Sequence, residues 1–133
     1  MRTSAIAAVL TGAALLSTTT AIEAQPRPPA SRPPQCFSAR DWAGWKATDD
    51  HSMYIRVRMR DIYRVDFADS CPTLSWPGMH LVSVFRGGDQ ICLPLDFNLK
   101  VSDGHGMATP CMVSRITPIP YAEAATLPRK LLP

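Results

Sequence analysis

Residues 53–67 have the sequence MYIRVRMRDIYRVDF, in which apolar and polar side chains alternate with a period of two. This alternation is typical of β-strands that have one face on a core and the other in solvent. It breaks once, so it predicts two strands joined by a tight turn. Paired residues in a hairpin share a face, and the apolar odd-numbered residues must therefore pair with one another. We expect the three-residue loop Arg60–Ile62, although a five-residue loop would keep the same alternation. The three-residue loop sets Met59 opposite Tyr63, Val57 opposite Val65, Ile55 opposite Phe67 and Arg56 opposite Asp66.

A second hairpin is predicted around Gly87-Gly88, because glycine adopts the positive φ angles of a two-residue turn at little cost. The flanking segments, 81–85 and 91–95, are rich in apolar residues. This turn would pair Val84 with Ile91 and Val82 with Leu93, and it would place Cys92 opposite Ser83.

Further strands are predicted toward the end of the chain. Residues 95–101 alternate again, residues 102–106 have the composition of a loop, and residues 111–117 are expected to form the last strand. The segment from Pro120 to Leu127 favours a short helix, since proline is tolerated at a helix start and Pro128 stops it. We therefore predict a mainly β fold: a small antiparallel barrel or sandwich of about five to six strands with a short C-terminal helix.

The N-terminal residues 1–24 have the features of a secretory signal peptide. Arg2 is followed by the apolar stretch Ala5–Leu16, about a dozen residues long, whereas a membrane-spanning helix needs roughly 20. Cleavage after Ala24, or after Ala21, would leave no membrane span. Residues 25–35 contain five prolines and predict an extended tether. The remaining residues, 36–133, are expected to form one β domain.

The four cysteines, Cys36, Cys71, Cys92 and Cys111, all follow the predicted signal peptide. Export leads to an oxidising compartment, where disulfides persist, so we expect two of them. Four cysteines allow three pairings; we favour Cys71 with Cys92 and Cys36 with Cys111. A zinc site that combines the cysteines with His80 or His105 is a weaker alternative, because the closely spaced cysteine pairs of structural zinc sites are missing. The pattern indicates no cofactor.

Charge gives little guidance to a partner. Of the 14 basic and 11 acidic residues, three basic and one acidic precede residue 36, which leaves the domain a balance of +1. This balance does not favour nucleic acid as a partner. The strongest candidate surface is an arginine ladder, which we define as Tyr54, Arg56, Arg58, Arg60 and Arg64. Guanidinium groups along one strand face would bind carboxylates or phosphates, unless Asp61 and Asp66 neutralise them in a solvated face.

Two histidine-containing stretches are alternative candidates. Asp49-Asp50-His51 could serve as a metal site or as an acid–base set, and His105 lies in the loop Asp103–Gly106. Aspartates that precede a strand more often bond the local backbone of a turn, which is the interpretation we favour for both stretches. Binding-platform tryptophans are a further alternative, although Trp42, Trp45 and Trp76 are expected to be buried.

The sequence also resembles a known family. The motif WKATDD at residues 45–50, the motif RDIYRVD at residues 60–66 and the Cys71-Pro72 pair are similar to those of small exported proteobacterial proteins known only as a domain of unknown function. The resemblance covers residues 36–133 and implies no catalytic residue, substrate or cofactor. We therefore expect an exported, periplasmic domain that binds a protein or envelope component, or an anionic ligand, without catalysis. A small hydrolase that uses Asp50 with His51 or His105, and a purely structural envelope protein, are the alternatives.

Overall fold

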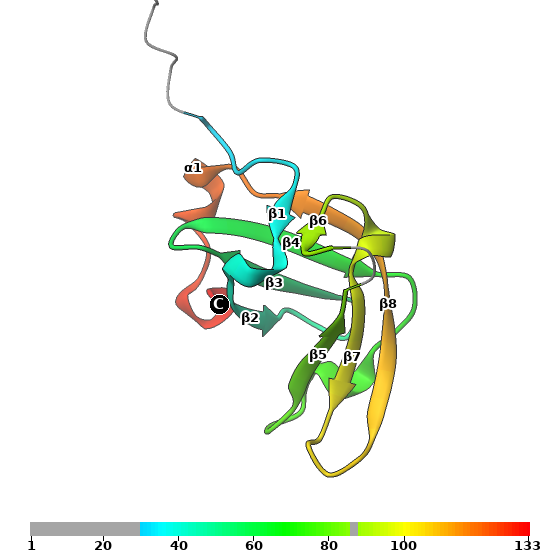
Figure 1. Cartoon of the computed structure of the whole chain (residues 1–133). Coiled ribbons are helices and arrows are strands. Elements are labelled where there is room, and N and C mark those ends of the chain that lie inside the picture. The colour runs from blue at the N-terminus through cyan, green and yellow to red at the C-terminus, as the bar shows by residue number, and fades with distance from the viewer. Residues whose placement is uncertain (1–29, 86–87) are drawn as a thin grey trace, which may run out of the picture.

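The computed structural model describes residues 30–85 and 88–133, in which eight strands, all paired antiparallel, form two sheets (Figure 1). In chain order they are β1 (Phe37–Ser38), β2 (Trp42–Ala47), β3 (Ser52–Val57), β4 (Asp61–Phe67), β5 (His80–Val84), β6 (Gln90–Ile91), β7 (Asn98–Ser102) and β8 (Ala108–Pro118). The helical elements are α1 (Tyr121–Ala124) and the 3-10 turns η1 (Ala39–Asp41), η2 (Pro72–Ser75), η3 (Pro94–Asp96) and η4 (Arg129–Leu131). The predicted class, mainly β with a short C-terminal helix, is confirmed.

The larger sheet has six strands in the order β2-β3-β4-β8-β7-β5 and curls into half a barrel, while β1 and β6 form a separate two-stranded sheet (Figure 1). Strand β8 joins the two halves of the larger sheet, since its first part pairs with β7 and its second part with β4. The register shifts between Asp66 and Phe67 where β4 meets β8. Such irregularities bend a strand and increase its twist. The long, bent β8 thereby curls the sheet around one core.

The β3–β4 hairpin has the predicted parity and a different loop. Odd-numbered residues do pair with one another, with Ile55 opposite Tyr63 and Met53 opposite Val65. The loop, however, is Arg58–Arg60 instead of Arg60–Ile62, so all four predicted facing pairs are wrong. The observed partners are Val57 with Asp61, Ile55 with Tyr63, Met53 with Val65, Arg56 with Ile62 and Ser52 with Asp66.

The loop lies two residues earlier in the chain than predicted because Ile62 belongs to β4, where its side chain is buried. Ile62 is buried in a second apolar cluster, with Tyr54 and Ile119, on the face of the hairpin that was predicted to be solvated. Residues from the C-terminal segment, including Leu127 and Leu131, cover this cluster. Met59, predicted to face the core, lies instead in the loop and is 92% exposed.

The second predicted hairpin is wrong. Strand β5 pairs with β7, which places Val84 opposite Asn98, and β6 pairs with β1, which places Ile91 opposite Phe37. Neither Val82 with Leu93 nor Ser83 with Cys92 is a facing pair, and Gly87 of the predicted turn lies outside the described residues. The 3-10 turn η3 interrupts the segment after β6 and leaves Leu95 exposed, so the strand predicted from residue 95 begins at Asn98.

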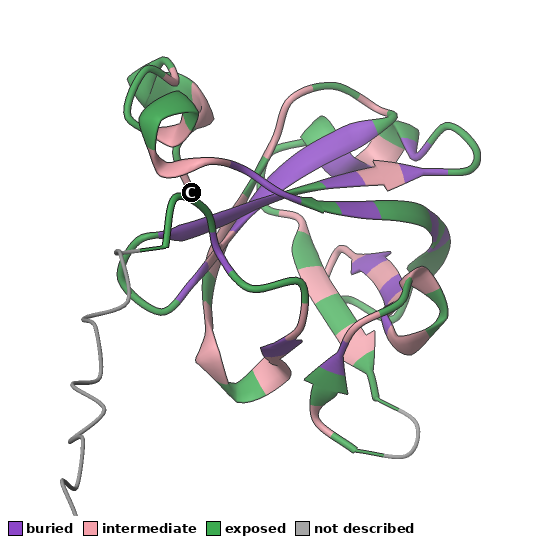
Figure 2. Cartoon of the chain, turned by 90° about the horizontal axis from the view of Figure 1, so that it is seen from above, coloured by how far each residue is buried: buried purple, intermediate pink, exposed green. Residues whose placement is uncertain are grey.

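The main core lies on the concave side of the curled sheet. Figure 2 shows the buried residues concentrated along its strands. Three rings meet there: Phe37 lies 4.6 Å from Tyr63 and 6.3 Å from Phe97, measured between ring centroids. The predicted alternation after residue 95 is confirmed at Phe97, Leu99 and Val101, all of which are buried. The core therefore unites the two-stranded sheet with both halves of the larger one.

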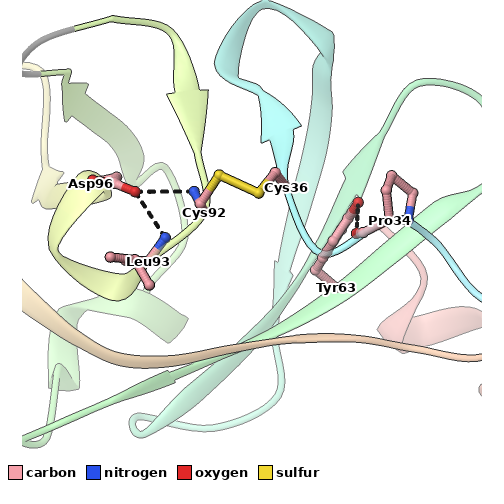
Figure 3. The surroundings of a disulfide bond; sticks show 6 residues. All are labelled: Pro34, Cys36, Tyr63, Cys92, Leu93 and Asp96. Carbon is pink, nitrogen blue, oxygen red and sulfur yellow. Dashed lines mark hydrogen bonds between the residues drawn. A yellow bond between two sulfur atoms is a disulfide. The ribbon is translucent and has the colours of Figure 1, made fainter.

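Two disulfides are present, as predicted, but the cysteines are paired differently. Cys36 is bonded to Cys92 and Cys71 to Cys111, so the predicted pairs are wrong. The physical reason is the strand order: β1 pairs with β6, which brings Cys36 to Cys92 (Figure 3). Strand β8 runs beside the end of β4, and the Ala68 backbone N–H donates to the Met112 carbonyl, which brings Cys111 to the segment of Cys71.

The last residues of the predicted tether contact the domain. The Tyr63 hydroxyl donates a hydrogen bond of 2.9 Å to the Pro34 carbonyl (Figure 3), and the Tyr121 backbone N–H donates to the Ser31 carbonyl at 3.1 Å. Pro33 between them is buried. The predicted signal peptide and residues 25–29 lie outside the described residues. In the part of the chain that is described, no helix has the length and apolar character needed to cross a membrane.

Asp96 holds η3 against the Cys36–Cys92 disulfide, and this contact predicts a pH dependence. Its Oδ2 accepts hydrogen bonds from the backbone N–H groups of Leu93, at 2.8 Å, and Cys92, at 3.0 Å (Figure 3). These bonds favour the carboxylate and lower the pKa of Asp96 below its ordinary value of 3.8. The stabilisation is therefore complete above that ordinary value and is lost as the pH falls through the lower folded-state pKa.

We expect Asp96→Ala to be less stable than the wild type at about pH 6, and the difference to shrink as the pH approaches about 2. Urea unfolding of both proteins across this range measures it. A difference that stays constant with pH would show that the carboxylate charge contributes nothing.

Candidate anion-binding site

The structure divides the arginine ladder among three elements. Arg56 lies on β3, Arg58 and Arg60 lie in the loop that follows it, and Arg64 lies on β4. Arg58 has a positive φ of 56°, which ends the strand alternation on which the ladder was based. Tyr54 is buried in the second cluster beneath the C-terminal segment. The five residues therefore do not form one continuous exposed face.

Arg58 is held by two carboxylates. Its Nε lies 3.0 Å from Asp41 Oδ2, and its Nη1 lies 3.7 Å from Asp61 Oδ2. The hydrogen bond to Asp41 is the main reason that the pKa of Arg58 is raised. The backbone N–H of Arg58 also donates to the Asp41 carbonyl at 2.7 Å. Arg58 thus joins η1 to the hairpin, which is a structural use of its charge.

Arg64 is also paired. Its Nε donates to Asp66 Oδ1 at 2.7 Å, and this bond raises the pKa of Arg64. The predicted neutralisation of the ladder by Asp61 and Asp66 therefore applies to Arg58 and Arg64.

Arg56 and Arg60 differ from the other two arginines. Both line a hollow of about 370 Å³ between the β3–β4 loop and the C-terminal segment, which we call the hairpin hollow. Within residues 30–85 and 88–133, no carboxylate lies within ion-pairing distance of either side chain. The hollow therefore contains two arginines that form no ion pair within the described residues, and the backbone of Pro133 also lines it.

The two guanidinium groups are positioned by their neighbours. The Arg60 guanidinium lies 4.6 Å from the centroid of the Tyr121 ring, a cation–π contact. Arg56 extends beside Gly44 on β2, where an added Cβ would lie 3.8 Å from Arg56 Nη2. That distance is an ordinary van der Waals contact, so Arg56 lies beside β2 without depending on the missing side chain.

Asp61 fixes the wall of the hollow and was not predicted to do so. Its carboxylate is almost fully buried, and its Oδ1 accepts a 2.8 Å hydrogen bond from the Tyr121 hydroxyl. This bond is the main reason that the pKa of Tyr121 is raised. The contact spans 60 residues of sequence, so no local signal could have revealed it.

The histidine-containing stretches have the predicted turn interactions. Burial acts to raise the pKa of Asp49, but hydrogen bonds from the His51 backbone N–H and from Ser52 lower it overall. His51 Nε2 lies 3.7 Å from Asp50 Oδ1. The other carboxylate oxygen of Asp50, Oδ2, accepts a hydrogen bond from the Ser70 hydroxyl at 2.7 Å. In the second stretch, Asp103 Oδ1 accepts from the backbone N–H groups of His105 and Met107.

These bonds orient backbone and loop groups and do not place a histidine against a nucleophile. Across the described ranges, no group of three or more histidine, cysteine, aspartate or glutamate side chains is arranged to hold a metal ion.

The tryptophans separate into two environments. Trp42 and Trp45 are half-buried and pack on the main core, and the Trp42 ring lies edge-on to Phe97 at 5.3 Å. Trp76 is 59% exposed, so its predicted burial is wrong. Its place just after η2 explains the exposure, because the turn buries Leu74 in the core instead.

A second depression lies beside η3 and was not predicted. This groove has a volume of about 500 Å³ and is bordered by η3 and β8, with the exposed side chains of Leu95 and Met112 on its rim. We call it the η3 groove. It contains Asp69 and no basic side chain. A further hollow of about 590 Å³ contains Arg64 and Arg115, but Asp66 and Glu123 lie in it as well. Of these three depressions, the hairpin hollow is the one that has arginine side chains and no acidic side chain.

The comparisons with known proteins agree with the resemblance found in the sequence. The model of a family described as a family of unknown function (DUF6491) matches residues 1–131. No curated protein and no solved structure matches the chain.

Proposed function

Because this chain belongs to the family of unknown function DUF6491, its role has to be argued from its own geometry, and we propose that it is an exported, non-enzymatic domain that binds an anionic group. The anion would belong to a protein or another component of the cell envelope. The observation that carries this proposal is the pairing pattern of the arginines. Carboxylates hold Arg58 and Arg64, whereas Arg56 and Arg60 line one hollow without such a partner among the described residues.

Two features support the exported, periplasmic location. The first is the signal-like sequence of residues 1–24. The second is the pair of disulfides, which include all four cysteines. Disulfides of this kind form and persist in oxidising compartments.

Arginine is suited to the proposed recognition. Its guanidinium keeps its charge at any physiological pH and can bind a carboxylate or phosphate through two parallel hydrogen bonds. The contact with Tyr121 holds the Arg60 guanidinium at the hollow before any ligand arrives. Groups that are already positioned lose less conformational entropy when they bind.

We expect the double variant Arg56→Gln/Arg60→Gln to keep its fold and to lose anion binding. Calorimetric titration at low ionic strength with acetate, and separately with inorganic phosphate, measures the affinity; thermal melting checks the fold. The control variant, Arg40→Gln/Arg115→Gln, makes the same change in net charge at two exposed arginines outside the hollow. Equal loss of binding in both variants would mean that net charge alone attracts the anion, and the proposal would be wrong.

A further inference from the structure

The hairpin hollow is mostly apolar apart from its two arginines. Met59 at the tip of the loop is 92% exposed although its side chain is apolar. Opposite it, the C-terminal segment contributes Ala124 and Leu132, and the sheet contributes Ile62. Met59 and Leu132 both line the hollow and are both exposed. The apolar part of a bound anion could pack against them and remove their surface from water.

The polar side chains of the hollow can donate hydrogen bonds but accept few. Arg56 and Arg60 have no acceptor atoms. The Tyr121 hydroxyl donates to the buried Asp61 and keeps its lone pairs, so it is the one strong side-chain acceptor among the lining residues. A peptide bound there would bring backbone N–H groups that these side chains do not satisfy, and an unsatisfied polar group is costly to bury. A carboxylate attached to a hydrocarbon chain has no such requirement.

The volume of the hollow limits the ligand's size. Ligand-binding cavities commonly measure about 300–1,000 Å³, and about 370 Å³ is near the lower end of that range. One short alkyl chain suits this space better than a two-chain lipid.

We propose that the hairpin hollow binds a single-chain amphiphile with one carboxylate head group. This inference rests on the proposed anion-binding function and adds the chemical class of the ligand. The head group pairs with Arg56 and Arg60, and the alkyl chain lies along Met59, Ile62 and Leu132. Charge complementarity places the head group, and the apolar wall places the chain.

Calorimetric titration with straight-chain carboxylates, from acetate to decanoate and below their micelle concentrations, tests this assignment. We expect the affinity to rise about fourfold for each methylene that becomes buried, until the chain fills the hollow. Arg56→Gln/Arg60→Gln should abolish octanoate binding, and octyltrimethylammonium should not bind the wild type. Leu132→Ser should weaken octanoate binding and flatten the dependence on chain length. Leu95→Ser is the matched control: it changes an exposed leucine of η3 that lies outside the hollow, and it should have no effect.

The possible outcomes separate this inference from the proposed function. If acetate and phosphate bind at Arg56 and Arg60 but the affinity does not rise with chain length, the inference of an amphiphilic ligand is wrong, and the proposed anion binding stands. If a peptide with a C-terminal leucine carboxylate binds more tightly than decanoate, the ligand is a protein terminus and the amphiphile is again wrong. If neither phosphate nor any carboxylate binds, both proposals fail. A chain-length dependence that disappears in the double arginine variant supports both.

Discussion

Replacement of Cys71 and Cys111 together by alanine is expected to lower the free energy of unfolding by about 4 kcal/mol. The two cysteines are separated by 40 residues, and a crosslink over that distance removes much of the conformational freedom of the unfolded chain. Both residues are buried where β8 meets the segment after β4, so alanine also leaves unfilled space in the core. For a domain of this size, such a loss is a large fraction of the total stability. Urea unfolding of the oxidised proteins, followed by tryptophan fluorescence, measures it.

The control is a variant that keeps two cysteines that are not bonded to each other in the structure. Cys71→Ala/Cys92→Ala leaves Cys36 and Cys111, which belong to different disulfides. We expect both remaining thiols to react with iodoacetamide once the protein is unfolded in urea without reductant, because neither has formed a disulfide. Formation of a Cys36–Cys111 disulfide in this variant, with wild-type stability, would contradict the observed strand pairing.

Tyr63→Ala is expected to destabilise the domain by about 3–5 kcal/mol. The Tyr63 side chain is fully buried, packs on the Phe37 ring and donates to the Pro34 carbonyl. Burial is the main cause that raises the pKa of Tyr63 to about 12, so its hydroxyl remains a donor over the whole physiological range. The residue therefore combines a large apolar contact with a hydrogen bond that holds the N-terminal segment.

Tyr63→Phe separates these two contributions. The ring remains, so we expect a loss of about 1 kcal/mol from the hydrogen bond alone. Amide hydrogen exchange should also become faster at Tyr121, whose N–H donates to the Ser31 carbonyl of the released segment. If Tyr63→Phe were as unstable as Tyr63→Ala, the hydroxyl and not the ring would dominate, and the packing argument would be wrong.

Local patterns predicted strands well and their partners poorly. The alternation in residues 53–67 identified β3 and β4, and the parity of the hairpin was correct. The choice of loop failed because Tyr54 was assigned to a solvated face and Ile62 to the loop, whereas Ile119 and the C-terminal segment cover both residues. The alternation within one segment cannot show that residues from a distant part of the sequence pack on its outer face.

Pairing over longer distances was missed for a related reason. Residues 81–84 were assigned to the nearest apolar segment, but their partner is β7, beyond β6 and η3. The same rearrangement determines the disulfides, because β6 brings Cys92 to β1. Spacing between cysteines cannot reveal a strand order.

The candidate site was predicted in part. The sequence suggested an anion-binding arginine surface, but it could not distinguish Arg56 and Arg60 from Arg58 and Arg64. That distinction depends on Asp41, which reaches Arg58 across 17 residues, and on the wall built by the C-terminal segment. The Asp61–Tyr121 contact that fixes this wall joins positions 60 residues apart, so it too required the fold.

The most direct test of anion binding at the hairpin hollow is nuclear magnetic resonance of the arginine side chains. Assigned Nε–Hε resonances of Arg56, Arg58, Arg60 and Arg64 would be followed while octanoate is added to the oxidised protein. Our account predicts saturating shifts at Arg56 and Arg60 with one common affinity, and unchanged resonances at Arg58 and Arg64, whose carboxylate partners already hold them. Saturating shifts at Arg58 or Arg64 instead, or no saturable shift at any of the four, would contradict it.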